Sequence, residues 1–578
     1  DNHGDFQLVA HVIAAAAEAN VTMVREQARA FLPEALVPPF ILFTKSFPLS
    51  ANGKVRRSAL PAPRADAEPA TQRLLAPQTP TEKLLAEAWA EVLDLEVGQI
   101  SRDANFLEIG GHSLAMTPLM LAIRRRFHVD FRLAELFAAL TVQSFARLID
   151  ERRRSRNGQV KPRETVQQRR TEAYGQQRMA YLRQEGELPA HIAPARGQFY
   201  RPTGPYRHVL LTGATGFLGV YIVAEILAQT DATLYCLVRP KKGAEARQRI
   251  EQQMRHYGVW QEDEVWQAQW RHRVQVLEGD VTLPLLGLAE RQYEQLSHEI
   301  DAILHSAAHV NFIYPYEALR ATNVLGIHEV MRFAFQGQIK PVHHLSTAAI
   351  WPMGSQFTFY EKDSIEHNQL LNLGYDEAKW VGEQCLLNAA ERGLPVVRYR
   401  PGEVGGDSVT GRCVTDHFLF ASIKGYLQHG AFPMLDIEVD VAPVDYVAKA
   451  LVYLMFSRQP IGRAFHLTNP KRRHMSDALT FLRSLGYQFA ERRFETLRDQ
   501  LLQSDNFANN ALFAYQSVLE EMDDISLQLP IYDTRVAERF LQGSGISCPP
   551  ADEKLFMTYV DYLRRTGFLP EPISTMSR

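Results

Sequence analysis

Short apolar runs alternate with longer segments of mixed polarity from His208 to the end of the chain. Three of these runs, at 208–212, 233–238 and 274–281, are rich in Val and Leu, and turn residues or helical patterns follow each one. A nearly continuous apolar run of this length is typical of a strand buried on both faces, and strands that alternate with helices favour a parallel sheet. The pattern predicts an α/β fold with a doubly wound sheet.

The first part of the chain has a different pattern. Residues 81–150 carry helical periods with few strand signals, which predicts a four-helix bundle. Pro and Ala are frequent over 61–80, as in a linker, and 151–178 is rich in Arg and Gln. Such a basic run is typical of a solvated helix or linker, with a docking surface as the alternative. Strand-like runs at 5–10 and 40–43 predict a small α+β segment near the start of the chain.

Length and composition limit the class of protein. The chain has 578 residues, 46% of them hydrophobic and 22% charged, which indicates several globular domains. The formal net charge of −3 gives no reason to expect nucleic acid or a membrane as partner, and no apolar run has the length of a membrane span. No secretory signal pattern is visible, and the four scattered cysteines lack metal-ligand spacing. We therefore expect reduced thiols, no metal site and a cytoplasmic location.

A glycine-rich loop follows the first predicted strand of the sheet. Gly213 allows a tight turn, Gly216 lets a pyrophosphate approach the backbone, and Gly219 lets the next helix pack closely on the strand. The loop lies between a strand and an apolar helix, which is the context that a dinucleotide-binding loop of Rossmann type requires. The residues predicted to hold the dinucleotide are Gly213, Thr215, Gly216, Phe217, Leu218 and Gly219.

Residues after the following strands predict which dinucleotide binds. The second strand ends in Arg239, where NAD-specific folds carry an acid for the ribose hydroxyls, so NADPH with its 2′-phosphate is favoured. Arg249 is either a second phosphate ligand or a solvated helix charge. Asp280, beside Val281, either contacts the adenine or caps a turn, and Ala307 is a small residue where the cofactor would pass.

A tyrosine and a lysine stand one helical turn apart further along. Tyr375 and Lys379 are four positions apart, which puts both side chains on one face of a helix. A pair of this spacing can also be the exposed face of an amphipathic helix. The order along the chain favours the functional interpretation, because the glycine loop comes first, then a strand ending in Ser346 and Thr347, and then the pair.

This order resembles the extended short-chain dehydrogenase/reductases. More narrowly, it is similar to the thioester reductase domains that end some nonribosomal peptide synthetases and are related to carboxylic acid reductases; Asn311-Phe312, 322–326 and 400–406 also fit that family. The resemblance implies an NADPH-dependent oxidoreductase that reduces a phosphopantetheine-tethered acyl or peptidyl thioester by hydride transfer. The product would be an aldehyde, and a further reduction to an alcohol stays open.

The same resemblance assigns roles to three residues. Tyr375 would donate a proton to the carbonyl oxygen, and Lys379 would lower the pKa of the phenol and hold the nicotinamide ribose. Thr347 would hydrogen-bond the same oxygen and is preferred to Ser346 for this role. These three residues are the predicted catalytic group.

The reductase part, residues 179–578, is expected to have two lobes. The nucleotide lobe would take about 205–404 and 435–470, and a smaller, mostly helical substrate lobe would take about 405–434 and 471–578. Within the nucleotide lobe, Val441–Asp445 is expected to form a strand that returns to the sheet.

A second motif presents a serine. Gly110-Gly111 opens a loop before Ser113, which starts a predicted helix, and N-capping alone would favour a serine at that position. The run from Asp103 to Leu114, with its flanking helices, resembles the peptidyl carrier (thiolation) domain of the same synthetases, here extending over 79–152. The resemblance implies that Ser113 carries 4′-phosphopantetheine. A helix N-terminus suits the phosphate, because its free N–H groups and its dipole favour negative charge.

The first 64 residues carry a third resemblance. Asn52-Gly53 is a tight-turn signal that displays Lys54, and the run 48–57 resembles the C-terminal lid of adenylation domains. In that family the lysine contacts the acyl-adenylate. The large nucleotide-binding core is not part of this sequence, so Lys54 is expected to have no role here. Linkers are expected at 65–78 and 153–178.

These resemblances imply partners and leave two alternatives. A phosphopantetheinyl transferase would load Ser113, and the adenylation and condensation domains of the same synthetase would act upstream. One alternative is a release domain that cyclises its cargo without redox chemistry, and the other is a carrier or docking module without catalysis. Tyr375 argues against the first, because such cyclising domains lose this tyrosine, and the intact glycine loop argues against the second.

Overall fold

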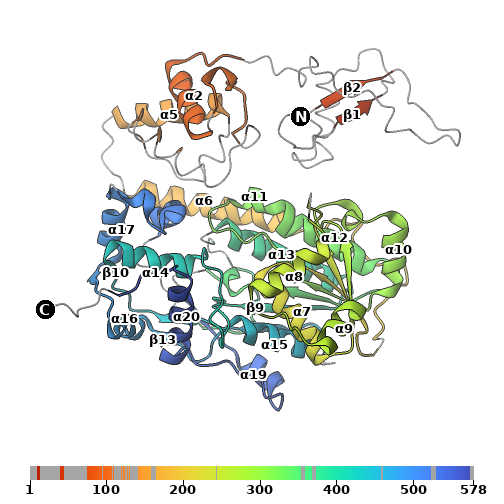
Figure 1. Cartoon of the computed structure of the whole chain (residues 1–578). Helices are drawn as coiled ribbons and strands as arrows, with labels where there is room; N and C mark the ends of the chain where they lie inside the picture. Colours follow the sequence, from red (N-terminus) through yellow and green to blue (C-terminus); the bar gives the residue numbers. More distant parts are fainter. Residues whose placement is uncertain are drawn as a thin grey trace. The chain divides into compact units, whose positions relative to one another are not determined.

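The computed structural model contains two compact parts, a first unit of residues 1–161 and a second unit of residues 162–578, and each is described by itself (Figure 1). The residues that the structure describes are 9–12, 40–44, 75–93, 95–106, 109, 119, 122–123, 126–127, 129, 139, 141–157, 164–202, 204–241, 244–352, 358–367, 371, 373–456, 460–504, 506–522 and 529–572.

The first unit has a strand pair and a helical part. Strand β1 (Val9–Val12) is parallel to β2 (Phe40–Phe43); of the predicted run at 5–10, residues 5–8 lie outside the described residues. Helix α2 (Pro80–Leu93) packs against α5 (Val142–Asn157). Its buried Trp89 meets Phe106 edge to face with ring centroids 5.0 Å apart. Ser113, the predicted attachment site, and Lys54, for which no role is expected, both lie outside the described residues.

The second unit is built on a seven-stranded parallel sheet. Its order is β12-β9-β7-β6-β3-β4-β5, so the chain first adds strands on one side of β3 and then on the other, which is the doubly wound arrangement. The strands are β3 (His208–Thr212), β4 (Thr233–Val238), β5 (Val274–Glu278), β6 (Ala302–His305), β7 (Val342–Leu345), β9 (Val396–Pro401) and β12 (Ala464–Leu467). The predicted fold class is confirmed.

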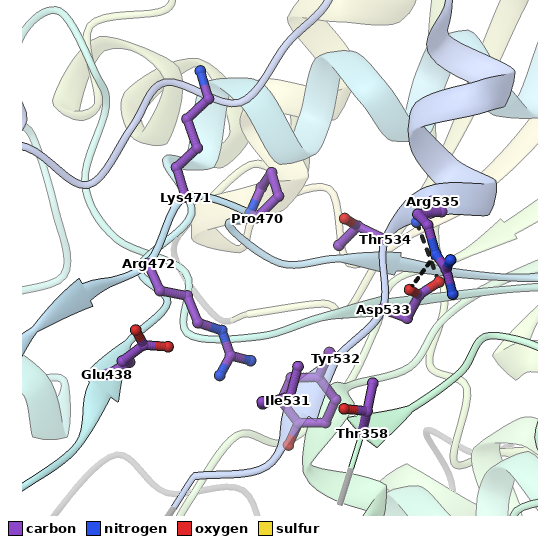
Figure 2. A pocket seen from close by; sticks show the side chains of 10 residues that line it. All are labelled: Thr358, Glu438, Pro470, Lys471, Arg472, Ile531, Tyr532, Asp533, Thr534 and Arg535. Atoms are coloured by element: carbon purple, nitrogen blue, oxygen red, sulfur yellow. Dashed lines mark hydrogen bonds and ion pairs between the residues drawn. The ribbon is translucent and has the colours of Figure 1, made fainter.

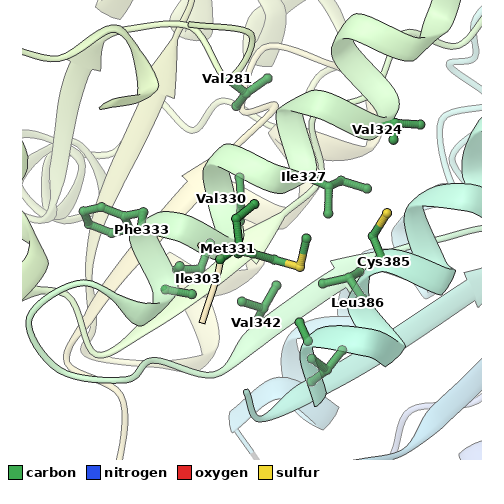
Figure 3. Close-up of a cluster of buried hydrophobic side chains, with 14 of the residues drawn as sticks. Val281, Ile303, Val324, Ile327, Val330, Met331, Phe333, Val342, Cys385 and Leu386 are labelled. Carbon is green, nitrogen blue, oxygen red and sulfur yellow. The ribbon is translucent and has the colours of Figure 1, made fainter. Parts of the chain in front are cut away.

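Alternate residues of β3 enter two separate apolar cores, one on each face of the sheet. Val209 and Leu211 face a core shared with helices α7 (Phe217–Gln229), α8 (Ala246–His256), α9 (Glu264–Arg273) and α15 (Val444–Phe456). Leu210 faces a core shared with α10 (Glu290–Glu299), α11 (Tyr316–Arg320), α12 (Gly326–Phe335) and α13 (Gly374–Glu391). In that second core, Ile327 and Met331 of α12 lie toward the side chain of Leu386 (Figure 3).

The predicted strand at Val441–Asp445 is wrong. Only an isolated bridge between Val404 and Ala442 forms there, and α15 already begins at Val444. Val441 and Ala442 are buried just before this helix, and of the predicted strand only Val444 and Asp445 belong to its first turn. Asp445 accepts hydrogen bonds from the backbone N–H and the hydroxyl of Ser408, at 2.9 and 2.7 Å.

The remaining elements form a smaller lobe of helices and very short strands. Its helices are α14 (Phe418–His429), α16 (Met475–Ser484), α17 (Phe494–Gln503), α18 (Gln516–Glu521) and α20 (Glu553–Arg565). The short strands pair as β10 (Ala431–Pro433) with β14 (Ala490–Arg492), β11 (Glu438–Val439) with β13 (Arg473–His474), and β8 (Thr358–Phe359) with β15 (Ile531–Tyr532).

One helix of the predicted substrate lobe joins the nucleotide lobe instead. Helix α19 (Arg535–Leu541) packs on α15 and β12, and its Ala537 and Leu541 are buried in the core on that face of the sheet. The nucleotide lobe is therefore completed by residues that follow most of the substrate lobe in the chain.

Two further observations concern the whole described chain. None of the helices among the described residues combines the length and apolarity that crossing a bilayer requires. Within the same residues no group of His, Cys, Asp and Glu side chains could hold a metal ion.

Candidate active site

The glycine loop connects β3 to α7 with almost no free space. Gly213 has a φ of +82°, and a Cβ at this position would lie 2.7 Å from the backbone nitrogen of Ala307. A Cβ at Gly219 would lie 2.1 Å from the carbonyl oxygen of Gly213. Only glycine fits either position, because the left-handed backbone at Gly213 and the close contacts at both exclude a side chain. The loop therefore packs closely on the end of β6 and on the first turn of α7.

The strand ends beneath this loop are tied together by side chains. The hydroxyl of Thr212 accepts a hydrogen bond from the backbone N–H of Ala307 at 3.1 Å and lies 2.8 Å from Nδ1 of His305. All of these atoms belong to the carboxyl ends of the neighbouring strands β3 and β6. Ligands of open α/β sheets bind at this edge, where the strand order reverses. Gly213 and Ala307, predicted separately from the sequence, are thus brought into contact.

The predicted phosphate and adenine residues lie together at the ends of β4 and β5. Nε of Arg239 is 2.7 Å from a carboxylate oxygen of Asp280, whose other oxygen accepts from the N–H and hydroxyl of Thr282 at 2.9 and 2.8 Å. Arg249 donates to the carbonyl oxygen of Arg239. Asp280 therefore caps a turn and also pairs with Arg239. The Val281 side chain lies in the apolar core, so toward a cofactor this residue offers its backbone.

The Tyr–Lys pair lies on α13, which follows β7 and precedes β9. Both side chains are buried, with Tyr375 9% and Lys379 2% exposed. The ammonium of Lys379 donates to the carbonyl oxygen of Leu345 at 2.6 Å and lies 3.4 Å from Nε2 of His344. Since Leu345 ends β7, the lysine fixes α13 to the strand end that leads into Thr347. The ring of Tyr375 meets Phe312 edge to face, with centroids 5.6 Å apart.

The two hydroxyls after β7 have different partners. Ser346 donates to Glu383 of α13 at 2.6 Å, inside the protein. Thr347 caps a short 3₁₀ turn (Ala348–Ile350), where its oxygen accepts from the N–H of Ala349 at 3.1 Å. The serine hydroxyl thus donates its proton to a partner inside the protein. Among the described residues, the Thr347 hydroxyl has no acceptor for its own proton.

Burial is the largest influence on the pKa values of Tyr375 and Lys379. It lowers the pKa of Lys379 to about 8, although the carboxylate of Glu383 opposes this shift. Burial, together with the charge of Asp376, raises the pKa of Tyr375. This direction differs from the predicted lowering by Lys379, because the ammonium of the lysine faces Leu345 and His344. The phenol consequently keeps its proton at neutral pH and can act as a donor.

Two residues of the site were not predicted from the sequence. His344 touches Lys379 directly, and its position at the end of a buried strand was the available signal. Glu383 continues the stripe of Tyr375 and Lys379 by one more turn of α13, and spacing alone could have found it. Its carboxylate binds Arg400 through Nε at 3.1 Å, and the side chains of both are 0% exposed.

A separate pocket of about 470 Å³ is lined by residues of β8, β11, β15 and α19 and of the segment after β12 (Figure 2). It is lined by Thr358, Glu438, Pro470, Lys471, Arg472, Ile531, Tyr532, Asp533, Thr534 and Arg535. Arg535 is paired with Asp533 across 2.7 Å, as the dashed lines in Figure 2 mark. None of the predicted site residues lines it, so we place the active site at the sheet edge.

The residues at the sheet edge fit a dinucleotide. The glycines leave backbone where side chains would stand, α7 begins at the loop, and its free N–H groups favour a phosphate. Arg239, with 60% of its side chain exposed, adds a cation at the end of β4. A doubly wound sheet with this loop, and with a Tyr–Lys pair on the helix before β9, defines a reductase domain of the short-chain dehydrogenase type.

Comparison with known proteins agrees with this class. One family model, described as a phosphopantetheine attachment site, matches residues 83–149 and so includes Ser113. Another, an NAD-binding family described as male sterility protein, matches residues 211–451. The first match lies in the first unit of the chain and the second match in the second unit.

Similar proteins carry both parts. A linear gramicidin synthase from Brevibacillus parabrevis is 33% identical over 98% of this chain, and the L-2-aminoadipate reductase large subunit of Penicillium chrysogenum is 29% identical over 95%. This chain spans only 11% and 41% of those two proteins. The crystal structure of the terminal R domain from the myxalamid PKS-NRPS pathway is 36% identical, with a TM-score of 0.63 over 68% of this chain and 99% of that domain.

The chain therefore belongs to the family of terminal reductase domains of nonribosomal peptide synthetases. Its first unit contains a carrier domain with a phosphopantetheine attachment site, and its second unit is an oxidoreductase domain that takes a nicotinamide cofactor.

Proposed function

We propose that this chain releases an acyl or peptidyl group from the phosphopantetheine arm on Ser113 by reducing its thioester to an aldehyde with NADPH. The observation that carries the proposal is the placement of Tyr375 and Lys379. Both lie on one face of α13, and Lys379 fixes that helix to the strand end that leads into Thr347. The glycine loop lies at the same edge of the sheet, so cofactor and proton donor would meet there.

The residues of the chain supply a proton and hold the reacting oxygen. When bound, the nicotinamide supplies the hydride for the thioester carbon. Tyr375 donates its phenolic proton to the carbonyl oxygen, and the Thr347 hydroxyl donates a hydrogen bond to the same atom. The resulting hemithioacetal breaks its carbon–sulfur bond, loses the proton from its oxygen and yields an aldehyde and the free carrier thiol. Lys379 would hold the nicotinamide ribose.

Arg239 and Arg249 are the proposed ligands of the NADPH 2′-phosphate. Their proximity at the end of β4 supports the assignment, since Arg249 bonds the Arg239 backbone. To bind phosphate, Arg239 would exchange its ion pair with Asp280 for one with the cofactor.

Single-turnover reduction of an acyl group loaded on the full chain tests the proposal. Tyr375→Phe should lower aldehyde formation by about 10²–10⁴-fold while NADPH still binds. Ser113→Ala should abolish loading by a phosphopantetheinyl transferase and spare the reduction of a free pantetheine thioester. A Tyr375→Phe chain that forms aldehyde at the parent rate would overturn the assignment. A released product without NADPH oxidation would favour the cyclising alternative.

A further inference from the structure

The last residue of the basic run, Arg178, contacts the reductase fold. Helix α6 (Glu164–Glu185) starts just after the first unit ends at residue 161, and its Met179 and Leu182 are 1% and 0% exposed. Both side chains lie in the same apolar core as Tyr375 and Ala378 of the catalytic helix. Helix α6 thus continues from the predicted linker, 153–178, into the reductase part, which was predicted to begin at residue 179.

Arg178 of α6 binds the catalytic helix through a two-pronged ion pair. Its Nε and Nη2 donate to the two carboxylate oxygens of Glu377 at 2.9 and 2.6 Å, and its Nη1 donates to Glu317 at 2.8 Å. The guanidinium also lies 5.3 and 5.4 Å from the ring centroids of Tyr181 and Tyr316. Only 18% of the arginine and 10% of the Glu377 side chain are exposed, so water and salt screen this pair weakly.

Glu377 lies between the two predicted catalytic residues in the first turn of α13. The first turn of a helix lacks intrahelical partners for its N–H groups, and the N-cap residue Leu373 makes no side-chain capping bond. The same turn approaches α11 closely, since a Cβ on Gly374 would lie 2.4 Å from the backbone nitrogen of Tyr316. Arg178 bridges the carboxylates of Glu377 and Glu317, which would otherwise repel each other. The ion pair thus adds a charged side-chain contact to the first turn of α13.

The contact between the two segments continues along the whole length of α13. Asn388 donates to the carbonyl oxygen of Gly186 at 2.8 Å, and Arg392 donates to those of Leu188, Pro189 and Ile192 at 2.6–2.7 Å. A second ion pair joins Glu185 to Arg320 of α11. The segment 178–192 therefore forms a strap that runs along α13, and Arg178 is the strap residue that bonds to Glu377 in the turn that carries Tyr375.

We propose that Arg178 is a positioning residue for the reduction, because its two-pronged ion pair with Glu377 fixes the turn of α13 that carries Tyr375. Its effect on rate rests on the proposed role of Tyr375, whereas its effect on the helix does not. The segment that leaves the carrier would then be joined mechanically to the proton donor.

Two measurements on the full chain test this inference, each with Arg320→Gln as the matched control. That variant removes the other arginine–glutamate pair of the strap and leaves the Tyr375 turn untouched. Arg178→Gln should raise amide hydrogen exchange in the first turn of α13, and Arg320→Gln should not. Arg178→Gln should also lower the single-turnover rate by about tenfold to a hundredfold, as misplacement of a reacting group does, with NADPH affinity unchanged. Arg178→Lys, which keeps the charge without the planar fork, should recover part of the rate.

If Arg178 acts by positioning Tyr375, its effect on the reduction rate should depend on the phenol of Tyr375. In a Tyr375→Phe background, Arg178→Gln should cause no further loss of rate, whereas a general structural defect would multiply the two losses. Unchanged exchange in the first turn, or multiplied losses, would overturn the inference. If Tyr375→Phe alone is fully active, the proposed function fails, and the exchange measurement still decides whether Arg178 holds the turn.

Discussion

At the scale of single residues, two adjacent hydroxyl side chains differ in whether their proton is donated inside the protein. Ser346 and Thr347 are adjacent hydroxyls after one strand, and their chemistry cannot be distinguished from composition. Ser346 gives its proton to Glu383, whereas the Thr347 oxygen accepts from a backbone N–H. The Thr347 hydroxyl has no acceptor among the residues that the structure describes, so it can donate to a ligand, and this supports the choice of Thr347.

Substitution of the two hydroxyls should have opposite consequences. Thr347→Val should lower the rate of thioester reduction without weakening NADPH binding, because only the hydrogen bond to the carbonyl oxygen is lost. Ser346→Ala should keep most of the rate but destabilise the fold by about 1–3 kcal/mol, since Glu383 loses a buried donor. Single-turnover rates and urea unfolding of both variants check this, and the reverse pattern would assign the role to Ser346.

The burial of Lys379 predicts a pH dependence. Its pKa is lowered to about 8, so the ammonium is present below that pH and is lost as the pH rises through it. If the charged form is needed, the reduction rate should fall between about pH 7 and 9. Lys379→Arg stays charged over this range, so whatever activity it keeps should lose this fall. A parent rate that stays constant across the range would exclude the requirement for charge.

Arg239 should determine the choice of cofactor. Arg239→Ala should weaken NADPH binding by about tenfold to a hundredfold, roughly 1.5–3 kcal/mol for a charge-assisted contact, and change NADH binding little. Titration of both cofactors into the full chain measures this difference. Equal losses for the two would mean that Arg239 serves only its ion pair with Asp280.

At the scale of elements, the buried parallel strands were the most predictable features. The predicted bounds of β3 and β4 agree with the structure, because a strand covered on both faces is a continuous apolar run. The other elements and the long-range ion pairs depend on tertiary contacts that the local sequence does not reveal. The run at 441–445 is also rich in apolar residues but forms only one isolated bridge before α15 begins at Val444, and β11 and β13 have two residues each. The partners of Arg178 lie 139 and 199 positions away, beyond any local pattern.

One face of helix α13 carries both the candidate catalytic residues, Tyr375 and Lys379, and the buried carboxylate of Glu383 that anchors the helix. The pKa of Glu383 is lowered to about 2, because the charges of Arg400 and Arg398 outweigh the effect of burial. Glu383→Gln should destabilise the fold by about 3–5 kcal/mol, since it leaves buried Arg400 without its counter-charge. Urea unfolding of Glu383→Gln and of a Glu383→Gln/Arg400→Met double variant checks this. If the double variant is no more stable than the single one, an unpaired charge is not the cause.

At the scale of the whole molecule, the nucleotide lobe depends on residues far beyond the glycine loop. Leu541 of α19 is 4% exposed and lies in the core around α7 and α15, although the NAD-binding family model ends at residue 451. Glu361 adds to this tie by accepting the backbone N–H groups of Val536 and Ala537 at 2.9 and 3.0 Å. The chain therefore returns to the nucleotide lobe with α19 after most of the substrate lobe, which the predicted lobe boundaries did not include.

Truncating one side chain of α19 tests this dependence. Leu541→Ala should destabilise the fold by about 2–5 kcal/mol, because it opens a cavity beneath the sheet, and should lower the urea midpoint at which NADPH binding is lost. Val409→Ala, at a position 82% exposed, is the control and should change neither. An unchanged midpoint in Leu541→Ala would show that α19 only covers the surface.

The order of strands in the sheet has a consequence for how the chain is made on the ribosome. β4 pairs with β3 and β5 with β4, after which β6, β7, β9 and β12 are added in turn on the other side of β3. Every strand thus pairs with a neighbour that has already been synthesised, and none has to insert between two strands that are already paired. The outer edge of β9 nevertheless stays open until β12 emerges at Ala464. An open strand edge can pair with another chain, so nascent chains are exposed to aggregation during this interval of synthesis.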